Sequence, residues 1–335
     1  ALLPVSATTL LVGVVIVTCS YLFVWGAWNG LSSTLGQQHV MSGQVSAMIN
    51  TIASVPGILA FLLGGALSGQ LEGERAESAA RTFFLAGAGI AILVALYGLL
   101  RPRVVFDNLK WEKGPKAHPW ADVKRLVRHW PVWPALLIWF LWNFAPGSVT
   151  PLQYYLQDTL HAQDVQWGEW NAIFAVSFIP TFLLYGAVCR RFKLRTLLWW
   201  GTVFAVPQFV PLAFVHSVDA ALIAAVPLGL MGGFASAAYI DLLIRSCPRG
   251  LQGTLMMAST ALYWLVSRFG DVLGTNLYDR FHGFTVCVIA ITVVYALILP
   301  TLLLIPKRII ATADGEVVEG GFDPDPIPAT ATQTA

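Results

Sequence analysis

The chain has 335 residues, of which 56% are hydrophobic and 11% are charged. A soluble globular domain carries roughly 25% charged residues, and a mean hydropathy of +0.68 excludes a water-soluble fold, because so much apolar surface needs lipid around it. The formal net charge of +2 gives no reason to expect a nucleic-acid partner. The four cysteines have neither metal-ligand spacing nor the pattern of a secreted disulfide framework.

Nine apolar runs follow one another along the chain. Each has about 18–25 residues, enough for a helix to cross about 30 Å of hydrocarbon. We expect helices rather than barrel strands, because the runs do not alternate in polarity and backbone groups in lipid must bond internally. The predicted spans are residues 7–31, 45–69, 82–100, 134–155, 168–189, 195–213, 219–244, 254–277 and 284–306. The predicted fold class is therefore an all-α, polytopic membrane helix bundle.

Lysine and arginine gather in every second connection. Residues 101–130 and 190–195 are rich in both, and Lys307 and Arg308 follow the last span, whereas residues 156–167 and 214–218 have none. The positive-inside rule then places the long loop and the C-terminus in the cytoplasm of a cell-membrane protein. Nine crossings from a cytoplasmic C-terminus put residue 1 outside, and the chain starts with Ala1. We therefore expect about three further helices to precede it.

The polar loop divides the chain. We expect three spans in residues 1–100, an inter-bundle loop at 101–133, six spans in 134–308 and a disordered tail at 309–335. Near the end of the loop, Val123, Leu126 and Val127 share one face of a short amphipathic helix suited to the lipid headgroup region. A solvated linker is the alternative.

Three spans, a long basic loop and six spans resemble a major facilitator superfamily transporter that lacks its first three helices. The loop signature of that family, Gly-x-Leu-x-Asp-Arg-x-Gly-x-Arg-Arg, is similar to residues 186–195 here. Arg190 stands at the position of the acid and Lys193 at that of the second glycine. The resemblance implies two bundles that rock about a central site, with a gate that includes Gly186, Arg190, Arg191 and Arg195.

Two further stretches are similar to the folate-biopterin transporter branch of that superfamily. One is residues 146–160, and the other is residues 243–254, which are similar to that branch's Leu-Cys-Pro-x-Gly-x-x-x-Thr. The branch has an acid in the second stretch, where this chain has Leu251 and Gln252. By resemblance, the driving ion is a proton.

Arg268 and Asp271 are the ionisable residues placed deepest in a predicted span. Such groups are costly in lipid, by about 2.5 kcal/mol or more, and therefore face a cavity or a partner. Arg268 could bind the carboxylate or phosphate of an anionic substrate, with Asp271, one turn away, as its counter-ion or as a protonatable coupling group. A helix-stabilising pair that reaches the outer interface is the alternative. Asp241 is expected to pair locally with Arg245.

Polar and aromatic residues in other spans complete the candidate substrate site. Trp142 and Asn143 precede Pro146, where the helix should break, and could stack on and hydrogen-bond a flat substrate. Trp142 could equally anchor at the interface. Asn50 could bind substrate or bond another helix, and Tyr239 could line the cavity or pack in the core.

These features predict a secondary active transporter of a small organic, possibly anionic solute, with the lipid bilayer and protons as its other partners. The alternative is a non-transporting membrane scaffold on the same fold. No phosphate-binding loop, metal-ligand cluster or nucleophile-base pair is visible, so neither an enzyme nor a cofactor-binding or metal-binding protein is expected.

Overall fold

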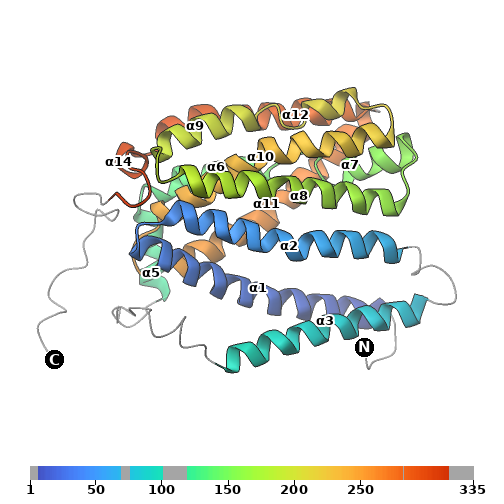
Figure 1. Cartoon of the computed structure of the whole chain (residues 1–335), viewed down its shortest axis with the longest axis horizontal. Helices are drawn as coiled ribbons and strands as arrows, with labels where there is room; N and C mark the ends of the chain where they lie inside the picture. Colours follow the sequence, from blue (N-terminus) through green and yellow to red (C-terminus); the bar gives the residue numbers. More distant parts are fainter. Residues whose placement is uncertain (1–6, 69–75, 101–118, 282, 317–335) are drawn as a thin grey trace, which may run out of the picture.

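The computed structural model describes residues 7–68, 76–100, 119–281 and 283–316, and every regular element in these ranges is a helix. The helices lie side by side in an elongated bundle (Figure 1). The long ones are α1 (Ala7–Gln38), α2 (Ser42–Ser68), α3 (Ala76–Leu99), α8 (Asp164–Val188), α10 (Val218–Ser246) and α11 (Gln252–Phe281). The shorter ones are α5 (Pro119–Arg128), α6 (Val132–Asn143), α7 (Thr150–Tyr154), η1 (Tyr155–Thr159), α9 (Leu194–Ala205), η2 (Val210–Phe214), α12 (Phe284–Ala296), α13 (Ile298–Thr301), η3 (Leu302–Leu304) and α14 (Lys307–Ile310).

The connections gather at the two ends of the bundle (Figure 1). At one end lie the turn between α1 and α2, the α8–α9 and α10–α11 connections, α5 and α14. We call this the α14 end. The α8 start, the η2–α10 connection and α7 lie at the other, which we call the α7 end. The alternation of the connections between the two ends agrees with the expected threading.

Six of the described helical segments are long and apolar enough to cross a membrane. They belong to α1, α2, α8, α9 with η2, α10, and α12 with η3. The chain is therefore a multi-pass membrane protein. Three of the nine expected spans fall outside this criterion: the apolar part of α3 is only Phe84–Leu99, the fourth expected span is interrupted after Asn143, and α11 carries Arg268 and Asp271.

The fourth expected span breaks where the prolines predict. α6 ends at Asn143, and α7 starts again with Pro151 in its first turn. Gly147 between them has φ +100°, a conformation that glycine adopts without strain. α11 covers the break closely, since a Cβ on Gly270 would lie 3.2 Å from the nitrogen of Ala145.

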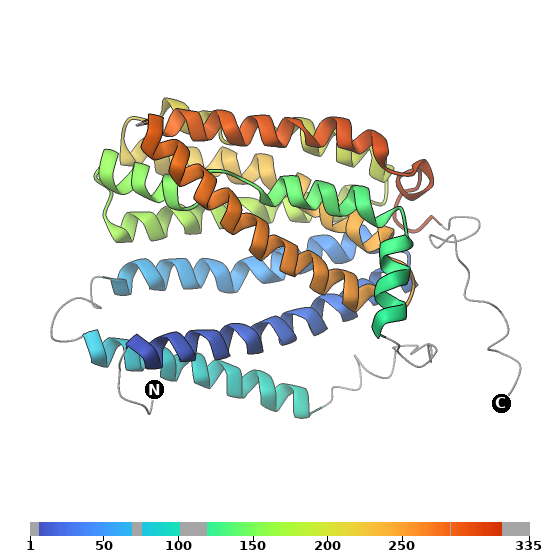
Figure 2. The same cartoon turned by 180° about the vertical axis from the view of Figure 1, so that it is seen from behind.

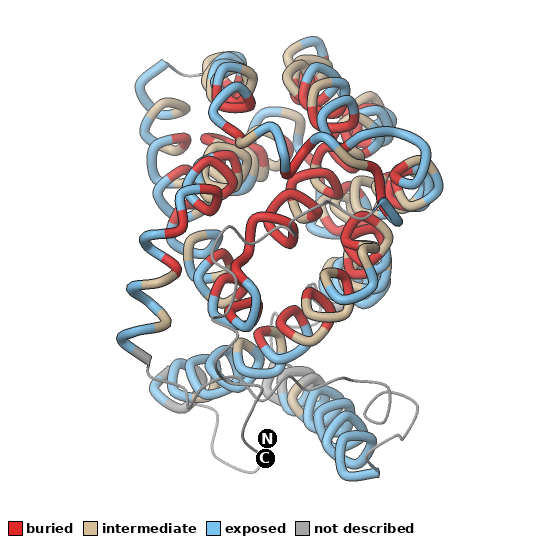
Figure 3. Tube along the Cα trace, turned by 90° about the vertical axis from the view of Figure 1, so that its left-hand side faces the viewer, coloured by how far each residue is buried: buried red, intermediate tan, exposed pale blue. Residues whose placement is uncertain are grey.

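α10 forms the centre of the packed core because its buried face consists largely of alanine and glycine. Small residues let neighbouring helices approach closely: a Cβ on Gly229 would lie 2.6 Å from the carbonyl oxygen of Phe174 in α8. Viewed from the α14 end, buried residues concentrate in the interior (Figure 3). α3 and the first half of α1 are exposed along nearly all of their described length.

α5 confirms the expected short amphipathic helix. Leu126 is buried against Cys247, Leu251 and Leu255, whereas Trp120 is 86% exposed. The helix is therefore fixed to the α10–α11 connection by one apolar side chain and presents another outward.

The expected disordered tail at 309–335 is wrong for its first eight residues. Ile309, Ile310, Ala313 and Asp314 are buried, and the backbone nitrogen of Asp314 donates to the carbonyl of Cys189. Apolar side chains at 309 and 310 and a charged partner for Asp314 hold this segment against the bundle. The rest of the expected tail, from residue 317 onward, lies outside the described residues.

Candidate functional site

The first two helices meet the later helices in two different ways. α2 and α8 approach closely at both ends: a Cβ on Gly186 would lie 3.1 Å from the Cβ of Ala47, and one on Gly65 would lie 3.1 Å from the Cα of Gly168. α1 and α11 instead approach near the α14 end, where a Cβ on Gly30 would lie 2.9 Å from the Cα of Gly253. From there the two helices diverge toward the α7 end (Figure 2).

The amide of Gln37 joins α1 to α10 and α11 at the α14 end. Its Nε2 donates to the carbonyl oxygens of Ile244 and Cys247, at 2.6 and 2.8 Å. Its Oε1 accepts from Nε2 of Gln252 at 2.6 Å. The last carbonyls of a helix have no partner within that helix, so Gln37 satisfies the C-terminus of α10 from another part of the bundle.

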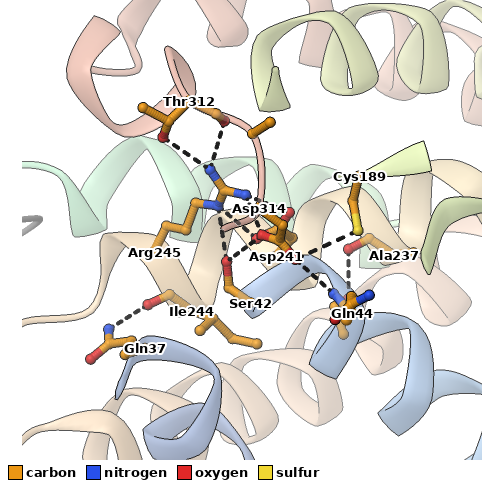
Figure 4. Close-up of polar contacts among 12 residues, drawn as sticks. Gln37, Ser42, Gln44, Cys189, Ala237, Asp241, Ile244, Arg245, Thr312 and Asp314 are labelled. Carbon is orange, nitrogen blue, oxygen red and sulfur yellow. Dashed lines mark hydrogen bonds and ion pairs between the residues drawn. The ribbon is translucent and has the colours of Figure 1, made fainter. Parts of the chain in front are cut away.

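Arg245 is the centre of a buried polar cluster beside this contact (Figure 4). Its side chain is 2% exposed, and its Nε lies 2.8 Å from Oδ1 of Asp241, which confirms the expected local ion pair. Its Nη2 lies 2.7 Å from Oδ1 of Asp314. Its Nη1 donates to the carbonyl of Thr312, and the hydroxyl of Tyr185 donates to Asp241.

The N-terminus of α2 enters the same cluster. Nε of Arg245 donates to the hydroxyl of Ser42 at 2.9 Å, and the backbone nitrogen of Gln44 donates to Oδ2 of Asp314 at 3.0 Å. One turn along, the hydroxyl of Ser46 donates to the carbonyl of Ala237 at 2.7 Å. We call these bonds, together with those of Gln37, the α14-end network.

A glycine makes room for the network. A Cβ on Gly43 would lie 2.9 Å from Oδ2 of Asp241, 2.9 Å from the Cβ of Cys189 and 3.0 Å from Oδ2 of Asp314. Two carboxylates and a thiol therefore approach the first turn of α2 where any larger residue would clash with them.

The pKa of Asp314 lies above its ordinary value. Burial is the largest cause, and the carboxylate of Asp241 adds to it, while Arg245 and the backbone amides of Gly43 and Gln44 act in the opposite direction. The single guanidinium of Arg245 does not fully offset the cost of burying the negative charges of both Asp241 and Asp314.

The four expected gating residues occupy different positions around this network. Gly186 lies at the close approach of α8 to α2, and Nη2 of Arg190 donates to Oε1 of Gln44 at 3.1 Å. Arg191 and Arg195 are exposed. The structure therefore brings two of the four to α2.

Arg268 lies near the middle of α11 and is exposed. It follows Met257 by eleven residues, about three turns at 3.6 residues per turn, so the two side chains share one face of the helix. Met257 contacts Gly26 of α1. Arg268 therefore faces α1 at a level where the two helices have separated, and no ion pair to it occurs in the described part of the chain.

Asp271 does not act as the counter-ion of Arg268. Its Oδ1 accepts from the backbone nitrogen of Thr150 at 2.9 Å, and its Oδ2 accepts from the hydroxyl of Thr150 at 2.7 Å. The expected pair is wrong because the interrupted helix leaves amides free at the start of α7, and Asp271 satisfies them.

The other expected substrate residues are engaged within the protein. Tyr239 is 1% exposed and its hydroxyl lies 2.9 Å from that of Thr202, so the alternative of a core residue is correct. Trp142 is half-buried, with its ring stacked on Tyr295 at 4.8 Å and edge-on to Tyr239 at 5.3 Å.

Asn143 and Asn50 are both half-buried, and the side-chain amide of each donates to a carbonyl four residues earlier, of Trp139 and Ser46 respectively. Each keeps its amide oxygen for a further partner. Trp142 and Tyr239 therefore contact each other, whereas the hydrogen bonds of Asn50, Asn143 and Asp271 described here are to other residues.

A pocket of about 300 Å³ lies between α2 and α8 beside the α14-end network. Gln44, Ala47 and Thr51 line it from α2, and Leu183 and Gly186 line it from α8. It contains one expected gating residue and none of the expected substrate residues, so it belongs with the α14-end network rather than with Arg268.

Sequence reasoning missed most of the α14-end network. It identified Asp241 with Arg245, but not Gln37, Ser42 or Asp314, which come from a helix end, a turn and a polar tail. The one available signal was residues 243–254, whose resemblance to a transporter motif includes Arg245 and Gln252.

Comparison with protein families matches the Major Facilitator Superfamily over residues 8–270. Among solved structures, a similar one is described as "Crystal structure of a Major Facilitator Superfamily (MFS) transporter, FucP, in the outward conformation". It has 15% sequence identity and a TM-score of 0.58, and the match covers 84% of this chain and 72% of that chain. At this identity the likeness shows the fold alone. Comparison with curated proteins gives no significant match.

Proposed function

The chain belongs to the major facilitator superfamily, and from this premise we propose that it transports a small organic anion by alternating access. Members of this family are secondary transporters and not enzymes. The proposed movement is a rocking of residues 1–100 against residues 134–308, with Arg268 at the central site and the α14-end network as one gate. In the described conformation that gate is closed.

The observation that carries this proposal is the asymmetry between α1 and α11. Near the α14 end their backbones meet at Gly30 and Gly253, and Gln37 adds three hydrogen bonds. Beyond Met257 the helices diverge (Figure 2). A pair of helices that is closed at one end and separated at the other is what one state of an alternating-access cycle requires.

Several polar contacts at the α14 end support a gate that can release. The bonds of Gln37, Ser42, Gln44 and Ser46 to the later helices are short but few, and none is covalent. The bonds between uncharged groups contribute about 0.5–1.5 kcal/mol net each and those to Arg245 and Asp314 about 1.5–3 kcal/mol, because water replaces them on opening. Differences of a few kcal/mol between two conformations are within reach of a substrate's binding energy.

The exposed Arg268 supports an anionic substrate. An arginine within a membrane bundle is retained where it meets water or a ligand, and its guanidinium matches a carboxylate or phosphate with two parallel hydrogen bonds. Since both carboxylate oxygens of Asp271 accept from Thr150, they do not orient the guanidinium of Arg268.

The distribution of basic residues supports a cytoplasmic α14 end and a location in the cell membrane. Arg190, Arg191, Lys193 and Arg195 lie in or beside the α8–α9 connection, and Lys307 lies in α14. The connections at residues 156–167 and 214–218 contain no lysine or arginine. By the positive-inside rule the closed gate then faces the cytoplasm. Coupling to protons is proposed from the family resemblance.

Uptake into proteoliposomes tests this function. The full chain is screened with labelled monocarboxylates, dicarboxylates and phosphate esters, with and without an inward proton gradient. We expect uptake of at least one anion, at least a tenfold loss in Arg268→Ala, and partial activity in Arg268→Lys, which keeps the charge without the bidentate geometry.

Arg280→Ala is the matched control, because Arg280 is an exposed arginine in the last turn of the same helix. It should leave uptake unchanged. Full uptake by Arg268→Ala would refute the anion site, and no uptake of any solute class by the wild-type protein would refute transport.

A further inference from the structure

The segment that follows the last span, residues 311–316, contributes to the α14-end network, although it belongs to no transmembrane helix. Thr312 and Asp314 both bind Arg245, at 2.9 and 2.7 Å. The backbone nitrogen of Leu194 donates to the carbonyl of Thr312, and that of Asp314 donates to the carbonyl of Cys189. These bonds fix the segment to α10 and to the α8–α9 connection.

The same segment also reaches the first two helices. Oδ2 of Asp314 accepts from the backbone nitrogen of Gln44, and the backbone nitrogen of Gly315 donates to the carbonyl of Val40 at 2.8 Å. Val40 lies in the α1–α2 turn with φ +52°, which is unusual for a β-branched residue. Gly315, with φ +89°, lets the segment turn toward it. One short stretch therefore touches both sides of the proposed gate.

The loop between α8 and α9 lies beside the first turn of α2. The guanidinium of Arg190 in this loop donates to the side chain of Gln44. The neighbouring Cys189 contacts Asp314 through both its backbone and its thiol, at 3.0 and 3.5 Å. A carboxylate is thus present beside the loop, but it comes from the C-terminal segment.

A carboxylate is a favourable hydrogen-bond acceptor at the N-terminus of α2. The first amides of a helix have no partner within that helix, and the helix dipole favours an acceptor at its N-terminus. Asp314 supplies the acceptor to α2 while its other oxygen binds Arg245. Because the segment is held by the later helices and caps α2, it joins the two sides only while the α14 end is closed.

We propose that residues 311–316 are a strap of the gate, in which Asp314 is the acceptor for the N-terminus of α2. Asp314 is a positioning residue, and the strap stabilises the state that is closed at the α14 end. This inference rests on the proposed function, since only an alternating transporter has a second state for the strap to oppose.

Distances between spin labels at residues 39 and 124 test the strap in the full chain in lipid nanodiscs. His39 lies in the α1–α2 turn, and Lys124 lies on α5, which is fixed to the α10–α11 connection; both are exposed and neither is part of the strap. The native cysteines are replaced by alanine. We expect Asp314→Ala to raise the ratio of long to short distances about tenfold, because a buried bond to a charged group is lost.

Truncation and rescue give two further measurements. A chain that ends at residue 310 should behave like Asp314→Ala, whereas a chain that ends at residue 316 should behave like the wild type. Arg190→Glu should restore the short distance when added to Asp314→Ala, because the new glutamate adds a hydrogen-bond acceptor to the α8–α9 loop. Asp219→Asn, at an exposed acid in the first turn of α10 at the α7 end, is the matched control.

Each result has a defined reading. Wild-type distances in Asp314→Ala, with a lengthened distance in Gln37→Leu, would overturn the strap and leave the proposed function intact. One fixed distance in all variants, including Gln37→Leu, would overturn alternation itself. An open gate in Asp314→Ala that Arg190→Glu does not close would overturn the assignment of Asp314 as the acceptor for the N-terminus of α2.

Discussion

Gln37→Leu isolates the contribution of one side chain to the gate. Leucine keeps a similar volume but removes the two hydrogen bonds to the C-terminus of α10 and the one from Gln252. All three join α1 to the later helices, so they are present in the closed state and replaced by water in the open state. The substitution therefore acts on the difference between the two states.

The magnitude follows from these three bonds. At about 1 kcal/mol net for each, the closed state loses about 3 kcal/mol. A change of this size multiplies the ratio of open to closed molecules roughly 150-fold. Apolar contacts of the new side chain reduce this figure, while the carbonyls of Ile244 and Cys247, which each lose one hydrogen-bond donor, increase it.

Double electron–electron resonance between labels at residues 39 and 124 measures the ratio of open to closed molecules directly. A short distance should dominate in the wild type, and a longer one should become populated in Gln37→Leu. Gln153→Leu, the same change in α7 at the opposite end of the bundle, is the control. An unchanged distance distribution in a folded Gln37→Leu protein would refute the idea that these bonds hold the gate.

Two further predictions concern the acids. Burial raises the pKa of Asp314 above its ordinary 3.8, so docking of the strap takes up a proton and is favoured as the pH falls through the raised pKa. The protection factors of residues 311–316, which compare each exchange rate with the intrinsic rate at the same pH, should therefore rise on acidification, and Asp314→Asn should remove this dependence. Protection factors that fall on acidification would contradict it. Asp271→Ala should destabilise the start of α7 by about 1–2 kcal/mol, because Thr150 loses its acceptor, seen as faster exchange at residues 150–159. Asp279→Ala, at an exposed acid of the same helix, should not change that exchange, and equal exchange in both variants would show that Asp271 is not the cap.

Some parts of the structure follow directly from local sequence. The helix break at Pro146 and Gly147 was predicted because proline removes a backbone donor wherever it lies. The ion pair of Asp241 and Arg245 was predicted because residues four apart are neighbours on any helix. α5 was predicted from the spacing of Val123, Leu126 and Val127.

The errors have a common origin in contacts between distant segments. Asp271 lies one turn from Arg268, but Thr150, distant in sequence, offers it two donors in a fixed geometry. Tyr239 has the composition of a cavity aromatic, yet the hydroxyl of Thr202 in α9 satisfies it in the core. The tail at 309–316 has a polar composition, but Arg245 provides a buried partner that composition does not reveal.

Hydrophobic length determined that this chain is a helical, multi-pass membrane protein, because the bilayer imposes that constraint on each segment separately. Only the tertiary structure decided which polar groups meet. Gln37, Gln44, Arg245 and Asp314 come from four separate segments, and hydrogen bonds form between atoms within about 3 Å of each other regardless of their separation along the chain.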